Sequence, residues 1–542
     1  MSSHSRFIRG AAILAVAGVG VRFIGAVMKI WLVRIVGDGG IGLYQMAYPI
    51  YSTLLAISTA GIPVAISKLV AEKVTVDDYR EAMRVFRIAL LILTFTGLLI
   101  TLVLYFTADT IVRLTNGDPL SIYSIMAIAP AIFFVTVMSA LRGFFQGQQY
   151  MFPTAASQVI EQVGRAVFSL YLAVSLLGWG VEYAAAGAAF GTAAGGLLGL
   201  LLLLLIYYRR RPAFMKRVRE QRDTASQPVG AIIRRIFSLA IPITFGSLIM
   251  PLLSLIDQLI VPGRLKAIGL AQQQATALYG QLTGMAGSVV YFPNVVTLAL
   301  SMSLVPAISE ALVLRNRKLV RTRAALSIKL TVLFSMPAAV GLYRLATPVI
   351  ALLFGYENAG AGYALAYMSW SVLPLGLYVA TTGILQGLGK TVTPVINMAL
   401  GGVLKAVLAW YLTSIPSLHI GGAALGSVIG TGLAAVLNLH AVAQQTGWRF
   451  RAGELVLLPG LSAAAMTAAV SLGYRVLLRA AAPALSPGAA NGCATLGAII
   501  AGAAVYGLAL LLSGSLTRDE LNLVPRIGPR LVELAERWRL LR

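Results

Sequence analysis

The stretch Phe144-Phe145-Gln146-Gly147, followed by Pro153, returns later in the chain as Ile384-Leu385-Gln386-Gly387, followed by Pro394. The two copies lie 240 or 241 residues apart, and both lie in strongly apolar surroundings. A single four-residue match arises easily by chance, so this pair gains its meaning from further matches in the same register.

Two further pairs occur in the same order along the chain. Ala65-Ile66-Ser67 recurs as Ala307-Ile308-Ser309 at an offset of 242 residues, and residues 187–192 recur as residues 422–427 at an offset of 235. The nearly constant offset indicates an internal duplication. A membrane protein built from two copies of one helical unit is the usual plan of a transporter, with its substrate path between the halves.

The composition predicts a membrane protein made of helices. Mean hydropathy is +0.83, and 11% of the 542 residues are charged, against about 25% in soluble domains. Apolar runs of about 18 or more residues, long enough to cross the hydrocarbon core as helices, recur along the whole length. We expect an all-α polytopic membrane protein with about 14 transmembrane helices, near residues 10–36, 42–70, 86–107, 121–143, 153–177, 183–207, 232–262, 276–311, 320–345, 361–387, 391–414, 420–441, 454–478 and 491–513.

The distribution of basic residues predicts the topology. With the N-terminus in the cytoplasm, 30 of the 43 Lys and Arg residues, Arg142 among them, fall in cytoplasmic segments and about 5 in outer loops. This bias follows the positive-inside rule, so we expect a multi-pass protein of the bacterial plasma membrane with both termini in the cytoplasm. Arg6 and Arg9 precede an apolar stretch that is too long for a cleavable signal, and we interpret that stretch as the first span.

The repeat and the loop charges together predict the domain organisation. Each copy has six helices, so both copies enter the membrane from the same side and form two parallel lobes, with two extra helices after them. We expect an N-lobe (1–208, helices 1–6), a basic cytoplasmic linker (209–230), a C-lobe (231–445, helices 7–12), helices 13–14 (446–515) and a cytoplasmic amphipathic tail (516–542).

Basic residues inside the first predicted span are the sharpest indication of function, because a charge at the bilayer centre costs about 2.5–3.5 kcal/mol. Arg22 and Lys29 are seven residues apart and therefore share a helix face, and Arg34 lies nearer the outer surface. One interpretation is a cationic wall of a water-filled cavity that receives an anion. The alternative is snorkelling, combined with pairing to Asp257 or Glu161 on other helices.

Four more candidates are among the ionisable residues of the predicted spans. Glu161 and Arg165 stand at positions i and i+4, which favours an ion pair within one helix; a structural polar seam and a substrate contact are both open. Asp257 is the acid nearest the middle of any span and is a candidate for binding a coupling cation or for gating, with a plain salt bridge as the alternative. Lys405 is a further candidate for substrate binding.

Several classes of function have little support in the sequence. Cys493 is the only cysteine, and the three histidines are scattered, so the sequence predicts neither a disulfide nor a metal site. No pattern resembles a nucleophile triad, a paired-carboxylate site or a P-loop, and we expect no enzyme activity and no cofactor other than a coupling cation, Na+ or H+. The net charge of +24 reflects topology and basic loops that touch anionic membrane lipids, not nucleic-acid binding.

Several motifs resemble the stage V sporulation protein B family over nearly the full length. They are GDGGIGLYQMAYP (37–49), GIPVAISKLVAEK (61–73), LRGFFQGQQYMFPTAASQVIEQVGR (141–165), YAAAGAAFGT (183–192), LVPAISEAL (304–312) and RDELNLVPRIGPR (518–530). The resemblance implies the polysaccharide transporter branch of the multidrug/oligosaccharidyl-lipid/polysaccharide exporter superfamily, with twelve core helices in two lobes and often two extra helices.

The resemblance also implies a substrate. It points to a flippase for undecaprenyl-pyrophosphate-linked sugars, notably the lipid II-type precursor of peptidoglycan, with spore cortex as one destination and cell-wall synthesis enzymes as partners. Arg22 resembles the first of three cavity arginines of related lipid II flippases, whereas the regions around 52–53 and 281–282 carry no arginine. The alternatives are a cation-coupled multidrug exporter of the same superfamily and a membrane scaffold that does not transport.

The buried charge differs between the two copies in this interpretation. Arg22 and Lys29 belong to the first copy, while Asp257 lies in the corresponding first helix of the second. We therefore expect the two halves to share a fold but not their chemistry, and the first lobe to bind the anion.

Overall fold

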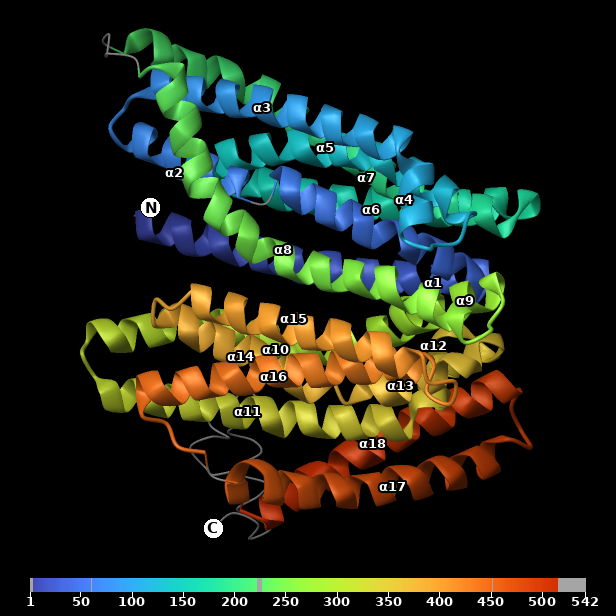
Figure 1. Ribbon diagram of the computed structural model, residues 1–542. Coiled ribbons are helices and arrows are strands. Elements are labelled where there is room, and N and C mark those ends of the chain that lie inside the picture. Colours follow the sequence, from blue (N-terminus) through green and yellow to red (C-terminus); the bar gives the residue numbers. More distant parts are fainter. Residues whose placement is uncertain (1–2, 60, 222–226, 451, 515–542) are drawn as a thin grey trace. The chain divides into compact units, whose positions relative to one another are not determined.

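The computed structural model describes residues 3–59, 61–221, 227–450 and 452–514, which are helical for most of their length and contain no strand. The chain divides into two compact units, Met1–Gly280 and Gln281–Arg542. The first unit contains α1 (Ser3–Thr59), α2 (Ile62–Thr75), α3 (Tyr79–Phe106), α4 (Ala108–Leu114), α5 (Ser121–Gly147), α6 (Phe152–Leu176), α7 (Val181–Glu220), α8 (Val229–Ala267) and α9 (Gln272–Tyr279) (Figure 1).

Helix α1 is too long to cross a membrane once, and it bends sharply at Gly37, whose φ of 68° and ψ of −171° are not helical. Gly25, before the bend, lies against Gln162 of α6, and Tyr44, after the bend, is hydrogen-bonded to Arg165 of the same helix. A straight helix would separate residues 25 and 44 by about 28 Å. The side chains of Gln162 and Arg165, which lie about one turn apart on α6, cannot reach two points so far apart. The chain therefore folds back at Gly37, and both halves of α1 contact α6.

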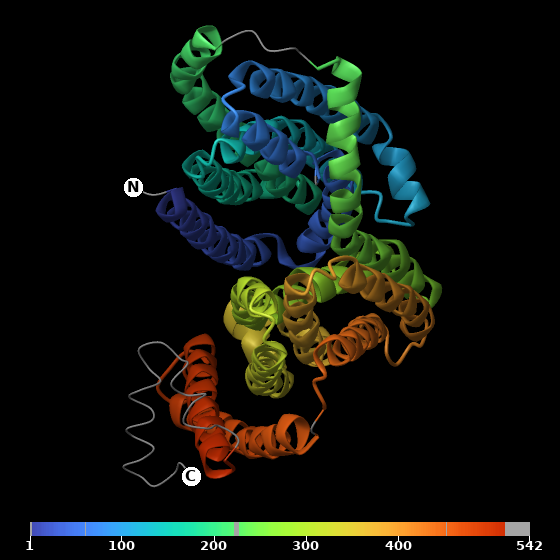
Figure 2. The same ribbon diagram turned by 90° about the vertical axis from the view of Figure 1, so that its left-hand side faces the viewer.

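The remaining helices of the first unit pack through close approaches at small residues. Gly147 of α5 lies against Ser67 and Val70 of α2, with no room for a Cβ. Helices α5, α6 and α7 pack against one another, as Figures 1 and 2 show. Helix α8 lies on the same unit, because the backbone N–H of Gly61 donates to Thr244 Oγ1 at 3.2 Å.

The second unit repeats this packing. It contains α10 (Gly287–Val313), α11 (Arg317–Arg344), α12 (Ala346–Phe354), α13 (Gly362–Ser369), α14 (Val372–Gly387), α15 (Val392–Thr413), α16 (Ile420–Thr446), α17 (Leu458–Ala481) and α18 (Pro487–Leu512). Gly387 of α14 lies against Val305 and Ile308 of α10, in the same way that Gly147 lies against α2. The sequence duplication is therefore a duplication of helix crossings.

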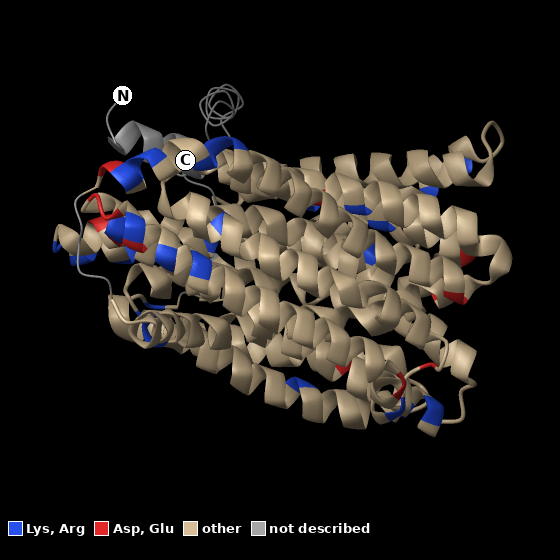
Figure 3. Ribbon diagram, turned by 90° about the horizontal axis from the view of Figure 1, so that it is seen from above, with Lys and Arg blue, Asp and Glu red and all other residues tan. Residues whose placement is uncertain are grey.

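The all-helical membrane fold is confirmed, but the number of spans differs from the predicted fourteen. Among the described residues, 12 helices are long and apolar enough to cross a membrane, or 13 if the bent pair Tyr356–Ser369 and Val372–Gly387 is one span. The first of these, Val16–Thr75, is 60 residues long and contains the fold-back at Gly37. If Val16–Thr75 crosses the membrane twice and the bent pair crosses it once, the number of crossings agrees with the predicted fourteen. Figure 3 shows long uncharged stretches within the helices, with charged residues concentrated near helix ends.

Some boundaries differ from those expected. The segment 209–230 was expected to be a linker, but α7 continues to Glu220, because its Arg, Lys and Glu residues are good helix formers. The compact units divide at Gly280, so α8 and α9 pack with the first unit; the predicted lobe boundary stays a prediction. Helices α17 and α18 agree with predicted spans 13 and 14 within a few residues. The predicted amphipathic tail lies outside the described residues.

Candidate functional site

A face of tyrosines lines the second half of α1. Tyr44, Tyr48 and Tyr51 stand at positions i, i+4 and i+7, so their rings lie on one side of the helix. The Tyr44 and Tyr48 ring centroids are 6.0 Å apart, and those of Tyr48 and Tyr51 are 5.8 Å apart. Tyr44 and Tyr51 are buried. The result is a continuous aromatic strip with phenolic hydroxyls along it.

Arg165 lies against this strip from the middle of α6, about 20 Å along the helix from Phe152. Its Nη2 donates a hydrogen bond to Tyr44 Oη at 2.7 Å, and its guanidinium carbon lies 5.1 Å from the centroid of the Tyr48 ring. Its Nε is buried and has no hydrogen-bond partner among the described residues. A buried donor without an acceptor costs about 1–3 kcal/mol, so this arrangement suits a site that receives an acceptor from a ligand.

Lys29 adds a second cation. It is half-buried on the first half of α1, and it lies close enough to Arg165 for the two positive charges to repel each other. Arg22, Gly25 and Lys29 share a helix face, which approaches α6 because a Cβ on Gly25 would lie 3.0 Å from Gln162 Nε2. The structure therefore places Arg22 and Lys29 on the side of α1 that faces α6, with Arg22 exposed.

The i, i+4 spacing predicted an ion pair between Glu161 and Arg165, but the structure pairs Glu161 with another residue. Its Oε2 lies 2.8 Å from Nη2 of Arg142 on α5, and Nε of Arg142 donates to Ser157 Oγ at 2.9 Å. Arg142 lies five residues before the end of α5 at Gly147, and its predicted cytoplasmic location stays a prediction. Because Arg142 neutralises Glu161, the guanidinium of Arg165 contacts Tyr44 and Tyr48 instead of a carboxylate.

Helix α7 holds this part of α6 in place through glycines. Gly191, Gly195 and Gly199 stand four residues apart and form one ridge. A Cβ on Gly195 would collide with the carbonyl oxygen of Glu161 and with the backbone nitrogen of Arg165. This close backbone contact fixes the orientation of the turn that carries both charged residues.

Two other predicted residues are Arg34 and Asp257. Arg34 is exposed and stacks over Trp31 at 5.7 Å, about 140° around α1 from Lys29, so it is not part of the cluster. Asp257 is half-buried in α8, between Pro251 and Pro262.

Lys405 belongs to the second unit and is 9% exposed. It follows Arg165 by 240 residues. A Cβ added to Gly430 of α16 would collide with Lys405 and with the carbonyl oxygen of Gly401. A Cβ added to Gly195 would collide in the same way with Arg165 and Glu161. Arg165 and Lys405 are therefore equivalent positions of the repeat. The expectation that buried charge is not duplicated was wrong here, because the helix pairs match in register.

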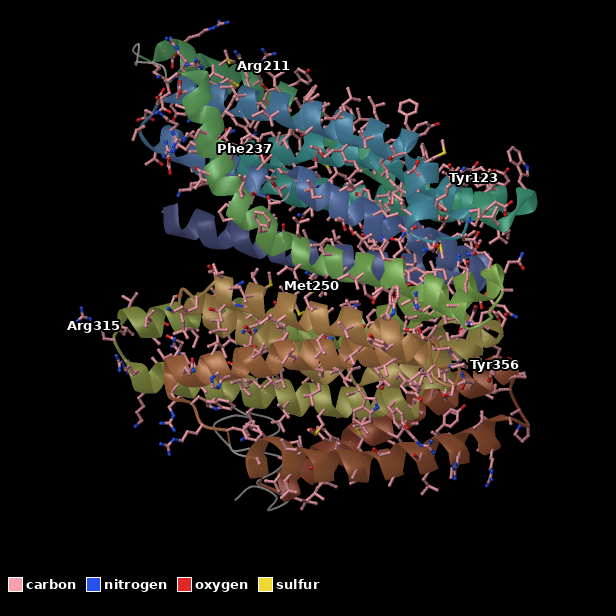
Figure 4. All side chains as sticks on the ribbon, viewed as in Figure 1. Tyr123, Arg211, Phe237, Met250, Arg315 and Tyr356 are labelled. Carbon is pink, nitrogen blue, oxygen red and sulfur yellow. The ribbon has the colours of Figure 1, made fainter. Side chains whose placement is uncertain are left out.

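A polar cluster fixes the turn between α2 and α3. It lies at the same end of the first unit as Arg211, which is labelled in Figure 4. Asp78 caps α3 and accepts hydrogen bonds from Gln221 Nε2 at 2.9 Å, the Glu81 backbone N–H at 3.2 Å and Lys73 Nζ at 3.5 Å. Burial acts to raise the pKa of Asp78, but these hydrogen bonds and the Lys73 charge together lower it below its ordinary value.

Sequence reasoning missed the tyrosines and Arg142. The spacing of Tyr44, Tyr48 and Tyr51 was visible in the sequence, but a tyrosine stripe alone does not indicate which charged residue faces it. Among the described residues, no group of three or more His, Cys, Asp or Glu side chains has the geometry to hold a metal ion. The chemistry of the cluster is cationic and aromatic, which suits an anionic ligand with many hydroxyl groups.

Comparisons with known proteins agree with this fold. Residues 7–312 match the family described as "Polysaccharide biosynthesis protein", and residues 242–411 match the family described as "MatE". Stage V sporulation protein B of Bacillus subtilis is 30% identical over 96% of this chain and 98% of its own. Lipid II flippase MurJ of the same organism is 28% identical over 82% of this chain and 84% of its own. A structure of lipid II flippase MurJ in an inward closed conformation shares the fold, with a TM-score of 0.68 and 14% identity over 92% of this chain and 98% of that one.

Proposed function

Because this chain belongs to the polysaccharide biosynthesis protein family, and within it to the stage V sporulation protein B group, we propose that it flips undecaprenyl-pyrophosphate-linked sugars across the plasma membrane. The protein is a multi-pass membrane transporter of the flippase type, and its relatives are transporters rather than enzymes. The proposed substrate is the lipid II-type precursor of peptidoglycan, delivered to cell-wall synthesis by alternating access, with spore cortex as one destination.

The observation that carries the proposal is the unpartnered Nε of Arg165 beside Lys29 and the tyrosine strip. Guanidinium groups bind phosphate oxygens through two parallel hydrogen bonds, and they bind them strongly where water is excluded. The hydroxyls of Tyr44, Tyr48 and Tyr51 can both donate and accept, as a sugar requires. In this proposal the pyrophosphate contacts Arg165 and Lys29, the sugar lies along the tyrosines, and the polyprenyl tail stays in lipid.

A flipping assay in liposomes of defined composition tests the proposal. Arg165→Gln and Lys29→Gln should each lower the flipping of lipid II by about tenfold or more, because each removes a charge-assisted contact worth about 1.5–3 kcal/mol. Arg34→Gln is the matched control, since it removes a cation from the same helix outside the cluster. Normal flipping by both cluster variants would overturn the site.

The same variants separate the rival functions. A cation-coupled drug exporter would transport cationic compounds and would gain, not lose, from the removal of a buried positive charge. A scaffold that does not transport would keep its cellular function in Arg165→Gln and lose it when residues 516–542 are deleted. A comparison of lipid II with other polyprenyl-linked sugars in the liposome assay then determines the sugar specificity.

Asp257 is the proposed residue for a coupling cation, either Na+ or H+, because it is a half-buried carboxylate within a predicted span. Asp257→Asn should abolish the stimulation of flipping by the driving gradient while leaving downhill exchange measurable. Imposed Na+ and pH gradients in the liposome assay distinguish the two cations. An unchanged response to both gradients would remove Asp257 from the mechanism.

The proposed topology places both termini in the cytoplasm. Cys493 is exposed near the start of α18, which in this topology faces the outside. A membrane-impermeant maleimide should therefore label Cys493 in intact cells, and Cys493→Ala should remove the signal. Labelling only after permeabilisation would show the opposite orientation.

A further inference from the structure

The second unit carries an apolar groove between α11 and α17. The groove has a volume of about 470 Å³. Met336, Ala339 and Val340 of α11 form one wall, and Gly460, Ala463 and Ala464 of α17 form the floor. These positions recur every three or four residues, so the groove follows one face of each helix.

The lining of the groove is apolar except for Thr467 and the indole N–H of Trp370. Thr467, the one hydroxyl residue in its lining, donates to the carbonyl oxygen of Ala463 at 2.7 Å. The groove is open at Gly460, Ala463 and Ala464 because these residues are small, and a bulkier side chain at any of them would fill it. Such a mainly apolar surface suits a hydrocarbon chain.

A cationic cavity of about 500 Å³ lies along the same face of α11, one turn further on. Its lining includes Tyr343, Arg344, Thr347 and Tyr363. Nε of Arg344 donates to Ser471 Oγ at 2.5 Å, and Ser471 lies one turn beyond Thr467 on α17. This hydrogen bond places the guanidinium at the end of the groove. Among the residues that the structure describes, the Nη groups of Arg344 have no hydrogen-bond partner.

Two aromatic side chains stand between groove and cavity. Trp370 lines the groove and Tyr343 lines the cavity, and their ring centroids are 5.4 Å apart. The two rings are 45% and 49% exposed, respectively. Trp and Tyr gather where hydrocarbon meets the headgroups. This pair therefore indicates that the cavity is at headgroup level, at the end of the second unit marked by Tyr356 and opposite the end marked by Arg315 (Figure 4).

We propose that the groove and the cavity together bind one anionic phospholipid of the leaflet at that end. One acyl chain lies in the groove, and the phosphate accepts hydrogen bonds from the Nη groups of Arg344. A lipid-facing apolar groove is filled by chains of the bilayer, and the cation at its end selects a lipid with negative charge. The site consists only of residues of the second unit, so the proposal does not depend on the identity of the transported substrate.

Phospholipid binding to the purified full-length protein tests the proposal. Native mass spectrometry counts bound lipid, and thermal stability is measured as phosphatidylglycerol is added to a phosphatidylcholine background. We expect one phosphatidylglycerol to bind in preference to phosphatidylcholine. Arg344→Gln should weaken binding about tenfold, which corresponds to about 1.4 kcal/mol, and Ala464→Leu should weaken it by filling the groove.

Matched variants serve as controls. Arg479→Gln removes an exposed cation from the last turn of α17, and Ala465→Leu adds the same bulk to a different face of that helix. Both should bind phosphatidylglycerol normally. If Arg344→Gln does not fold, Arg344→Lys, which loses the two-pronged geometry but keeps the charge, replaces it.

Three results would overturn the proposal. Binding unchanged in both Arg344→Gln and Ala464→Leu would show that the site is not used. Equal binding of phosphatidylcholine would remove the role of the charge. Displacement of phosphatidylglycerol by a much lower concentration of a polyprenyl phosphate would show that the groove takes the tail of the transported lipid instead, whereas glycerol phosphate without chains should not displace it.

Discussion

The α6–α7 pair of the first unit and the α15–α16 pair of the second have the same backbone contact and different side chains. Gly195 meets the carbonyl oxygen of Glu161 in one pair, and Gly430 meets that of Gly401 in the other. Both crossings have the glycine that permits the close approach, but the position of Glu161 in the first unit is occupied by Gly401, which has no side chain, in the second. The close backbone contact thus persists without the carboxylate, while Lys405 keeps the positive charge at the position of Arg165.

The neighbouring polar groups differ in the same sense. In the first unit an ion pair joins α5 to α6, with Arg142 and Glu161 2.8 Å apart. At the corresponding place in the second unit, neutral groups join α14, α15 and α16. Asn397 Nδ2 donates to Asn438 Oδ1 at 2.8 Å, and Asn438 Nδ2 donates to Thr382 Oγ1 at 3.2 Å.

The helix caps repeat this difference. Asp78 caps α3 and accepts from the Glu81 N–H, and Asn316 caps α11 and accepts from the Leu319 N–H at 2.9 Å. Thus Asp in the first unit is Asn in the second, and an ion pair in the first is an amide network in the second. The comparison teaches that helix crossings tolerate either chemistry, and that the charged version lies in the half proposed to bind the ligand.

The largest expected effect separates Arg165 from its repeat equivalent Lys405. Arg165→Gln should lower flipping about 10- to 100-fold, because it removes charge-assisted contacts worth about 1.5–3 kcal/mol. Lys405→Gln should lower flipping less than about tenfold, because the proposed pyrophosphate contacts, Arg165 and Lys29, lie in the first unit. Initial rates in liposomes, corrected for reconstituted protein, measure both. Equal losses would show that the two halves share the substrate.

The next effect concerns the ion pair and its neutral counterpart. Glu161→Gln leaves the Arg142 cation, whose side chain is 14% exposed, without its partner and should destabilise the protein by about 2–3 kcal/mol. Asn397→Ala removes one neutral hydrogen bond and should cost about 1 kcal/mol. Unfolding in detergent is the measurement. A double-mutant cycle with Arg142→Met isolates the pair, and a coupling near zero would contradict the stabilising role of the ion pair.

Gly195→Ala and Gly430→Ala test whether the two crossings are equally tight. Each should cost about 1–3 kcal/mol, because a methyl group meets backbone atoms that cannot move aside easily. Gly432→Ala is the control on the same helix as Gly430, since nothing lies within 4 Å of its Cβ position. Thermal unfolding compares the three, and a cost for Gly432→Ala as large as for Gly430→Ala would remove the argument from crossing geometry.

The smallest effect is the pH dependence of the two caps. The pKa of Asp78 is lowered in the folded protein, so its stabilising contribution is present above the pKa of the unfolded chain, near 3.8, and is lost as the pH falls through the lower folded value. Asp78→Asn should therefore flatten the acid limb of the stability curve. Asn316→Asp should introduce such a limb into the second unit, and identical curves for all variants would contradict the assignment.

Much of the fold could be predicted because membrane helices have a strong local signal. Long apolar runs and the repeated FFQG and ILQG motifs indicated two helical copies. The break at Gly37 agrees with the gap expected between the first two spans, but the hydropathy pattern does not indicate that both halves of α1 contact α6. The end of α7 was missed because charged residues can extend a helix into water as readily as they form a loop.

The candidate site was less predictable, for a different reason. Arg165 and Lys29 stand out as charges in apolar sequence, but their surroundings depend on which helices pack together. Spacing within α6 suggested a Glu161–Arg165 pair, and only the position of α5 shows that Arg142 takes Glu161. The equivalence of Arg165 and Lys405 follows from contacts with Gly195 and Gly430 that lie on other helices. Partners across helices carry no local signature.

The fold-back of α1 also has a consequence for biosynthesis. Tyr44 leaves the ribosome about 120 residues before Arg165, a delay on the order of ten seconds at usual synthesis rates. During that interval Arg22, Lys29 and the tyrosine strip have entered the insertion machinery without the helix that packs against them. The cost of each unpaired cation in hydrocarbon, about 2.5–3.5 kcal/mol, favours keeping this first hairpin in contact with water or with an insertion chaperone until α6 arrives. The proposed substrate site is therefore also a point at which we expect assembly of the protein to be delayed.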